Sequence, residues 1–551
     1  MSKSGDLVRL ADAVLLPGFE GVTPPDWVRR RLGEGLAGVV LFSRNIADPA
    51  QVAALTAALR AENPFALIGT DEETGEVTRL EVATGSTRPG GYALGVVDDV
   101  ALTEALARDL GLDLAACGIT IDFAPSADVN SNPDNPVIGL RAFGADPDLV
   151  SRHTRAFVRG LQSAGVAACA KHFPGHGDTS VDSHHGVPVV APGGIEDALR
   201  PFREAIKEGV RSIMTGHLLV PAYDPDLPAT LSPKVLTGLL REELGFEGMI
   251  VTDGIEMAAV SGMYGIGGAA ARAIAAGADA ICVGGEHADE ATAIEVRDAI
   301  ATAVADGLLP EERLADAARR VRELAAWSAS SGSTTPGTTT GGTTLDGMAL
   351  GGAGLGGAGL GGAGLGGAGL DGAGLDGAGL GGAVAGGTAV AGRGERNGHA
   401  GLAAARRAVR VTRRSGAAVL PLRTPPHVVE LTPEMNLAID KDTPWGVAGP
   451  LAELLPGTAV TRFAAGEASG AAIEDLVALA AARPLVVVVR DVHRYPWQGE
   501  AVRHLLSARP DAVVVEMGLP QRSDLGAVHI ATYGSAPVCG RAAAEVITGT
   551  L

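Results

Sequence analysis

The chain has 551 residues, so we expect more than one domain. Hydrophobic residues make up 46% and can form a sizeable core, although aromatic residues are only 3% and leave most of that core to Ala, Val, Leu and Ile. The formal net charge of −20 argues against nucleic acid or an anionic membrane surface as a partner, because both require clustered Lys and Arg.

The N-terminal segment contains a short apolar run that Pro17 breaks, with Asp6 before it. This pattern does not predict a signal peptide, and no stretch is apolar for the ~18 residues that a membrane span needs. None of the four cysteines forms a CxxC pair, and Cys117, Cys169 and Cys282 lie in apolar segments. Buried cysteines of this kind are typical of a reducing compartment, so we expect a cytoplasmic protein.

Short apolar runs alternate with Ala- and Leu-rich helical patterns in the first part of the chain. The runs cover Gly38–Phe42, Ala66–Asp71, Ile119–Pro125, Ala167–Phe173, Ser212–His217, Met249–Asp253 and Ala280–Gly284. Alternating strand and helix signals are typical of a parallel sheet with crossover helices. Six or more such units favour a (β/α) barrel over the alternative, a doubly wound sheet.

Polar residues cluster at equivalent positions, the carboxyl ends of these predicted strands. They are Asp71, Asp128, Lys171, His172, His217 and Asp253. In a parallel barrel the active site is built at that rim, so the pattern predicts a catalytic or binding site there.

The acidic run DEETGE begins at Asp71, which can accept hydrogen bonds from sugar hydroxyls; an acidic surface turn is the alternative. Further along the chain, Arg141 lies in a loop rich in Pro and Gly. Its guanidinium presents a fork of donors that suits a hydroxyl or a carboxylate.

The most polar segment is Lys171–His185, which carries four His and two Asp directly after an apolar run. No histidine spacing in it is diagnostic of a metal site, and its Pro-Gly turn is too weak a pattern for a phosphate cradle. The carboxylate of Asp182 can orient the imidazole of His184 and favour its protonated form, which makes an acid/base pair. A capped turn with a solvated histidine is the alternative.

Asp253 ends an apolar run and is followed by Gly254. An ionised Asp at a barrel strand end can attack an anomeric carbon and form a glycosyl-enzyme intermediate. The alternative is an N-cap for a following helix, a position that Asp also favours.

Residues 328–398 are rich in Ser, Thr and Gly and then repeat a five-residue unit, LGGAG or LDGAG. A period of five fits neither a helix nor a strand, and Gly loses the most backbone entropy on ordering. We expect a flexible linker, with a Gly-rich repeat structure as the alternative. This segment separates a catalytic domain over 1–327 from a smaller C-terminal domain over 399–551.

The C-terminal region contains two apolar runs, Pro484–Val489 and Asp511–Glu516, on either side of a helical stretch. They predict a small α/β domain with a parallel core. Asp491, His493 and Arg494 follow the first run, and we interpret them as a surface turn.

Together and in this order, these segments resemble glycoside hydrolase family 3, and within it the β-N-acetylglucosaminidase branch. The resemblance covers residues 8–325 and is weaker in the C-terminal region. Its most specific stretch is KHFPGHGDTSVDSHHGVP at 171–188. Others are IDFAPSADVNSNPDNPVIGLRAFG at 121–144, PATLS at 228–232 and LREELGFEGMIVTD at 240–253.

The resemblance implies a TIM-like (β/α)8 barrel without a metal or organic cofactor, and a role for each matching residue. Asp253 would be the nucleophile, and His184, held by Asp182, the proton donor and acceptor. The residues that would bind N-acetylglucosamine are Asp71, Arg79, Arg141, Lys171 and His172. The implied partner is a small saccharide, often a cytoplasmic cell-wall fragment in which N-acetylglucosamine is linked to N-acetylmuramic acid, and we expect a monomer.

Two other functions stay open at this point. A neutral His repels anions less than a carboxylate does, so phosphate can replace water, and a β-N-acetylglucosaminide phosphorylase is the first alternative. A non-catalytic sugar-binding protein on the same fold is the second. The family commonly reads DQEGGR where this chain has DEETGE at 71–76. We expect the two additional acids, Glu72 and Glu76, to weaken binding of an anionic muramic acid group.

Overall fold

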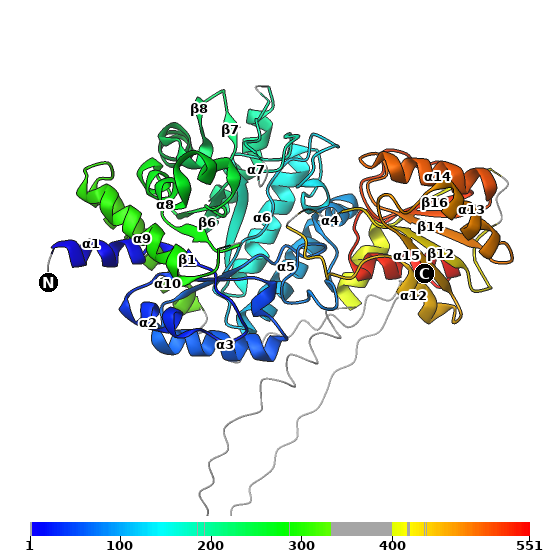
Figure 1. Cartoon of the computed structure of the whole chain (residues 1–551), viewed down its shortest axis with the longest axis horizontal. Helices are drawn as coiled ribbons and strands as arrows, with labels where there is room; N and C mark the ends of the chain where they lie inside the picture. Colours follow the sequence, from blue (N-terminus) through cyan, green and yellow to red (C-terminus); the bar gives the residue numbers. More distant parts are fainter. Residues whose placement is uncertain are drawn as a thin grey trace, which may run out of the picture.

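The computed structural model describes residues 3–183, 186–191, 193–285, 287–331, 399–415, 419–434, 436 and 438–551. They form two α/β units, a barrel and a C-terminal sheet with helices, which lie side by side (Figure 1). Most of the predicted linker, like the predicted acid/base residue His184, lies outside the described residues.

Eight parallel strands form the barrel, one more than the apolar runs predict. They are β1 (Leu15–Pro17), β2 (Gly38–Leu41), β3 (Leu67–Thr70), β4 (Ile121–Asp122), β5 (Ala167–Phe173), β6 (Ser212–Thr215), β9 (Met249–Thr252) and β10 (Ile281–Val283). Strands β2 to β9 pair in chain order, β10 joins β9 through a bridge between Val251 and Ala280, and β1 pairs with β10. Because β1 also contacts β2, the sheet curls round on itself, which confirms the predicted barrel.

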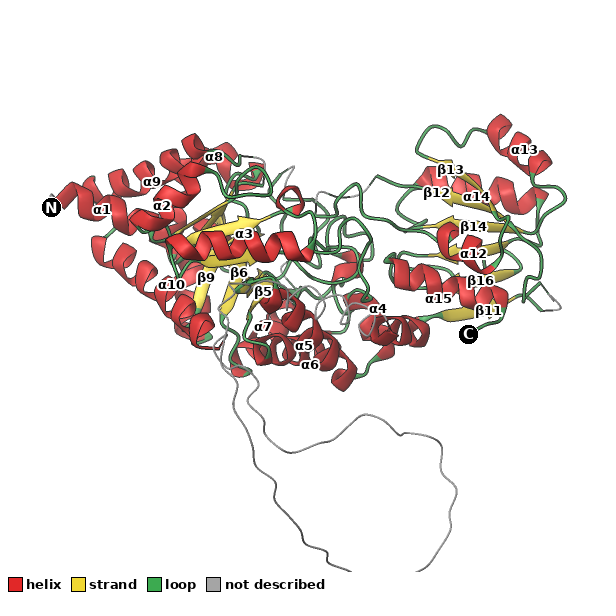
Figure 2. Ribbon diagram, turned by 90° about the horizontal axis from the view of Figure 1, so that it is seen from below, coloured by secondary structure: helices red, strands yellow, loops and turns green. Residues whose placement is uncertain are grey.

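Helices connect successive strands and cover the outside of the barrel (Figure 2). They are α1 (Lys3–Asp12), α2 (Asp26–Glu34), α3 (Pro49–Glu62), α4 (Gly91–Val97), α5 (Val100–Ala116), α6 (Pro147–Ser163), α7 (Ile195–Lys207), the π-helical segment Lys234–Glu243, α8 (Ala258–Ala276), α9 (Glu290–Ala305) and α10 (Glu311–Ser331). A short antiparallel hairpin, β7 (Leu219–Val220) and β8 (Asp224–Pro228), follows β6. Helix α10 continues through the predicted domain end at residue 327 to Ser331.

Local sequence fixes where several of these helices begin. Asp48 accepts a hydrogen bond from the backbone N–H of Gln51 at the start of α3, and Pro49 takes the first helical position. Asp146 and Pro147 repeat the arrangement at α6. An Asp cap satisfies a backbone donor that the helix leaves unpaired, and Pro needs no such partner.

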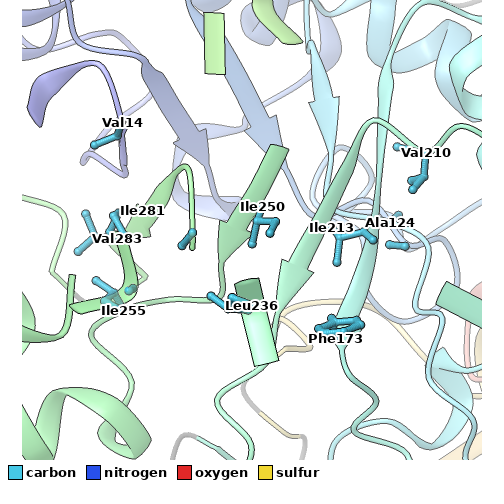
Figure 3. Packing of buried hydrophobic residues seen from close by; sticks show 14 of the residues in the cluster. Val14, Ala124, Phe173, Val210, Ile213, Leu236, Ile250, Ile255, Ile281 and Val283 are labelled. Carbon is cyan, nitrogen blue, oxygen red and sulfur yellow. The ribbon is translucent and has the colours of Figure 1, made fainter. Parts of the chain in front are cut away.

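The strands carry apolar side chains on both faces, as a parallel barrel requires. Met214 in β6 and Val251 in β9 pack with residues of the other strands inside the barrel. Their neighbours Ile213 and Ile250 point outward and pack against the helix layer, for example with Leu236 (Figure 3). The alternation along each strand therefore builds two cores from one sheet.

The C-terminal unit is a six-stranded sheet in the order β11-β16-β15-β14-β12-β13, parallel except for the edge strand β11. Its elements are β11 (Arg410–Arg413), β12 (His427–Leu431), α12 (Ala448–Leu454), β13 (Ala459–Phe463), α13 (Gly470–Leu479), β14 (Leu485–Val489), α14 (Pro496–Ala508), β15 (Val513–Glu516), β16 (Val528–Ala531) and α15 (Pro537–Thr548). Separate apolar clusters fill its two faces, so this domain is doubly wound.

All four cysteines are buried with free thiols, as the apolar segments around Cys117, Cys169 and Cys282 predict for those three. Among the described residues, no helix is both long and apolar enough to cross a membrane.

Candidate active site

A pocket of about 420 Å³ opens at the carboxyl ends of the barrel strands. It brings together all but two of the predicted site residues, namely Asp71, Arg79, Arg141, Lys171, His172 and Asp253. Asp182 is buried directly beside the lining residue Ser183, whereas His184 lies outside the described residues. The C-terminal domain also reaches the pocket, through Ala438.

A cluster of carboxylates and cations occupies one part of the pocket. Lys171 Nζ lies 2.7 Å from Asp71 Oδ1 and 2.6 Å from Glu73 Oε1. Arg141 donates to both oxygens of Glu73, at 2.8 and 2.7 Å. Burial opposes ionisation of Glu73, but Arg141 and Lys171 outweigh it and hold the pKa of Glu73 well below its usual range. Glu73 is therefore ionised, and its ion pairs hold Lys171 and Arg141 in place.

Glu73 is one of the site residues that sequence reasoning missed. It stands two positions after Asp71 in the acidic run, so both side chains turn to the same side at the end of β3. The signal was this spacing together with the two cations, Lys171 and Arg141, that the sequence already placed at the site.

His172 is oriented by the buried carboxylate of Asp128. Asp128 Oδ2 lies 2.8 Å from His172 Nδ1, and Asp128 Oδ1 accepts the backbone N–H of His176 at 2.7 Å. Burial opposes ionisation of Asp128, yet His172 lowers its pKa. With its Nδ1–H directed at Asp128, His172 presents Nε2 toward Arg141 at 3.3 Å, so the imidazole links Asp128 to the cluster around Lys171.

Asp253 directly follows β9 and lines the pocket. Its backbone N–H donates to the carbonyl of Thr215 at 3.1 Å, and its Oδ1 accepts the N–H of Gly254 at 2.8 Å. The predicted alternative, an N-cap, is wrong, because α8 begins only at Ala258. Behind this turn His217 Nε2 lies 2.9 Å from the Gly254 carbonyl oxygen, so the buried imidazole supports Asp253 without reaching the pocket.

A second carboxylate from the same segment, Glu256, also lines the pocket. Its Oε1 accepts the backbone N–H groups of Gly284 and Gly285 at 3.1 and 2.5 Å, which fixes it beside the end of β10. Sequence reasoning did not single it out.

The two additional acids of the DEETGE run do not line the pocket. Glu72 turns inward, and its Oε2 accepts the backbone N–H groups of Arg79 and Leu80 at 2.7 and 2.9 Å. Glu76 turns to the C-terminal domain, where it contacts Arg490 and Ser535. The expectation that these acids repel an anionic sugar is therefore wrong, because both are paired away from the site.

The interpretation of Asp491, His493 and Arg494 as a surface turn is also wrong. Asp491 is buried with a left-handed φ of 53°, and His493 Nε2 lies 3.1 Å from the Pro133 carbonyl of the barrel. This segment is part of the contact between the two domains.

Comparison with known proteins decides the family. Residues 28–324 match the profile described as "Glycosyl hydrolase family 3 N terminal domain". The chain belongs to glycosyl hydrolase family 3. Among the solved structures of this family, a β-N-acetylglucosaminidase from Paenibacillus sp. str. FPU-7 is 32% identical with a TM-score of 0.79, over 99% of this chain and 97% of that one.

Curated relatives named beta-hexosaminidase match differing shares of this chain and of their own length. "Beta-hexosaminidase A" from Pseudoalteromonas piscicida is 37% identical over 42% of this chain and 42% of its own length. "Beta-hexosaminidase" from Stenotrophomonas maltophilia (strain K279a) is 36% identical over 54% of this chain and 93% of its own length. The chain spans about half the length of three curated relatives that it matches.

Proposed function

We propose that this chain is a retaining β-N-acetylhexosaminidase that removes terminal β-linked N-acetylglucosamine from small saccharides. The observation that carries the proposal is Asp253, a carboxylate at a barrel strand end, in one pocket with the fixed cluster of Asp71, Lys171 and Arg141. The names of the family 3 relatives support the same activity.

The reaction runs in two steps. Asp253 attacks the anomeric carbon while protonated His184 donates its proton to the glycosidic oxygen, so that the aglycone leaves and a glycosyl-enzyme ester forms. Neutral His184 then takes a proton from water, the hydroxide oxygen bonds to the anomeric carbon, and Asp253 is released as a carboxylate. Two inversions leave the product with retained β configuration. Asp182 would orient His184 in both steps.

The cluster around Lys171 supplies binding and orientation. Cationic donors on Lys171, Arg141 and Arg79 suit sugar hydroxyl and carbonyl oxygens, and Asp71 accepts from hydroxyl groups. Because ion pairs already hold these side chains, little reorganisation is needed when the charge of an oxocarbenium-like transition state develops near Asp253.

The natural aglycone and the location are the finer parts of the proposal. We propose that the chain acts in the cytoplasm on peptidoglycan fragments. The acids that argued against an anionic muramic acid group face away from the pocket, which supports this choice of aglycone. Release of N-acetylglucosamine from a muropeptide disaccharide, compared with chitobiose, tests the aglycone, and fractionation of the native cells tests the location.

Release of nitrophenol from nitrophenyl β-N-acetylglucosaminide tests the activity. NMR of the first-formed sugar tests whether the anomeric configuration is retained. We expect turnover, β-N-acetylglucosamine as the initial product, and no acceleration by added phosphate. His184→Ala should slow substrates with poor leaving groups most. No turnover would favour a sugar-binding protein, and a strong phosphate dependence with a sugar phosphate as product would favour a phosphorylase.

A further inference from the structure

The loop that follows β3, residues 71–90, lies between the pocket and the C-terminal domain; we refer to it as the β3 loop. Its pocket side carries Asp71 and Arg79. Its other side packs closely on the C-terminal domain, because a Cβ added at Gly85 would lie 2.4 Å from Pro537 Cγ. Figures 1 and 2 show the C-terminal sheet beside this end of the barrel in both views.

One buried ion pair fastens the β3 loop to the C-terminal domain. Arg490 Nη2 lies 2.6 Å from Glu76 Oε2, with side-chain exposures of 8% and 6%. The hydroxyl of Ser535 donates to the other oxygen, Glu76 Oε1, at 2.6 Å. Both oxygens of the Glu76 carboxylate are thus taken up by the C-terminal domain.

Arg490 stands at a special position in the C-terminal sheet. It directly follows β14, which lies next to β12 where the strand order reverses. In open α/β sheets such a reversal leaves a crevice outside the carboxyl ends of the strands, where ligands commonly bind. Here the carboxylate of Glu76, from the barrel, pairs with Arg490 at that end of the sheet.

A second contact joins the C-terminal domain to the sugar-binding side of the same loop. Arg79 Nη2 donates to the carbonyl of Ala438 at 3.1 Å and lies 4.0 Å from Asp71 Oδ2. Glu72 accepts the backbone N–H of Arg79, so the segment from Glu76 to Arg79 is held at both of its ends.

We propose that Arg490 and Glu76 are positioning residues, through which the C-terminal domain holds the β3 loop so that Arg79 and Asp71 face the bound sugar. The inference rests on the proposed function. The matched relative from Stenotrophomonas maltophilia aligns over 93% of its length with only 54% of this chain. Glu76 stands where the family pattern has Arg. In this chain the C-terminal domain therefore holds the loop through a residue that departs from that pattern.

The test compares full-length wild type, Arg490→Gln and Glu76→Gln on nitrophenyl β-N-acetylglucosaminide. We expect KM and the inhibition constant of free N-acetylglucosamine to rise about tenfold or more, because each change breaks the buried ion pair that holds the loop. The value of kcat should change less than about threefold, since neither residue touches the reacting atoms. The exchanged pair, Glu76→Arg with Arg490→Glu, should recover most of the lost affinity.

Arg407→Gln is the matched control, because Arg407 pairs with Asp99 across the same two domains at 2.8 Å but is half exposed and does not touch the β3 loop. Its KM should stay within about twofold of wild type. Ser535→Ala, a milder change, should raise KM less than Arg490→Gln does.

Hydrogen exchange of residues 71–90 gives a readout independent of turnover. We expect faster exchange in Arg490→Gln than in wild type or Arg407→Gln. Unchanged exchange, or a loss confined to kcat, would overturn the inference. A wild-type protein that releases no nitrophenol would contradict the proposed function instead, and the exchange data would still decide whether Arg490 anchors the loop.

Discussion

Glu72 is buried at the base of the β3 loop, with 1% of its surface exposed. Its Oε2 accepts two backbone N–H groups, from Arg79 and Leu80, whereas Oε1 has no hydrogen-bond partner among the described residues. Burial, with a smaller contribution from the negative charge of Glu81, raises the pKa of Glu72 from 4.5 to about 7. The folded protein therefore keeps Glu72 protonated at pH values where the unfolded chain has lost the proton.

The consequence is a pH-dependent loss of stability. Between pH 4.5 and 7 the folded state binds more protons than the unfolded state, so the free energy of unfolding falls as pH rises. The contribution of Glu72 to the free energy of unfolding is fully present below pH 4.5 and lost above pH 7. A pKa shift of this size corresponds to about 3 kcal/mol. Glu72→Gln removes the titration and keeps an acceptor for the two N–H groups. Gln is also the residue that the family pattern has at this position.

Urea unfolding followed by circular dichroism at pH 5, 6, 7 and 8 measures the effect. Glu72→Gln should lie within about 1 kcal/mol of wild type at pH 5 and exceed it by about 3 kcal/mol at pH 8. Glu247→Gln, a change at an exposed loop residue of the same domain, is the control and should show no such trend. A difference that stays constant with pH, or a variant less stable than wild type at pH 8, would refute the reasoning.

Three further outcomes are expected. Asp253→Ala should lower kcat at least about a thousandfold with an unchanged circular dichroism spectrum, and near-normal turnover would remove Asp253 from the mechanism. Glu73→Gln should cost about 3 to 5 kcal/mol of folding stability and raise KM, because it leaves the cations Lys171 and Arg141 facing each other without their shared carboxylate. A wild-type denaturation midpoint for this variant would contradict that. Deletion of residues 351–382 should leave kcat/KM within about twofold if the segment acts as the linker that its composition predicts, and a large loss would show a structural role.

The barrel could be predicted from the sequence almost completely, because each apolar run that ends in a polar residue is a strand of the structure. The missed strand is β1, which has only three residues and ends at Pro17. Pro17 broke the apolar pattern, yet a proline at the last position of a strand removes no N–H that β1 needs for pairing. The partner strand β10 lies more than 260 residues away, so nothing local marks β1 as a strand.

The candidate site was predictable where position on a strand decides the direction of a side chain. Asp71 and Asp253 directly follow strands, Lys171 lies near the end of β5, and all three line the pocket. Within the β3 loop, by contrast, the direction of each side chain depends on partners that lie far away in the sequence. Neither Arg490 nor Ser535 is marked by the sequence as a partner for a barrel carboxylate, because both lie more than 400 residues further along the chain.

The four acids of DEETGE show that the net charge of a segment does not determine which charged groups lie near a bound sugar. Asp71 and Glu73 face the pocket and are matched there by Lys171 and Arg141. The other two acids are paired with backbone N–H groups and with the C-terminal domain. Of the four carboxyl groups, only those of Asp71 and Glu73 therefore line the pocket. Three cations, Lys171, Arg141 and Arg79, face those two carboxylates, whereas the segment of Asp253 and Glu256 contributes no lysine or arginine to the described lining residues. We therefore expect an anionic aglycone to bind better beside the cations than beside Asp253 and Glu256.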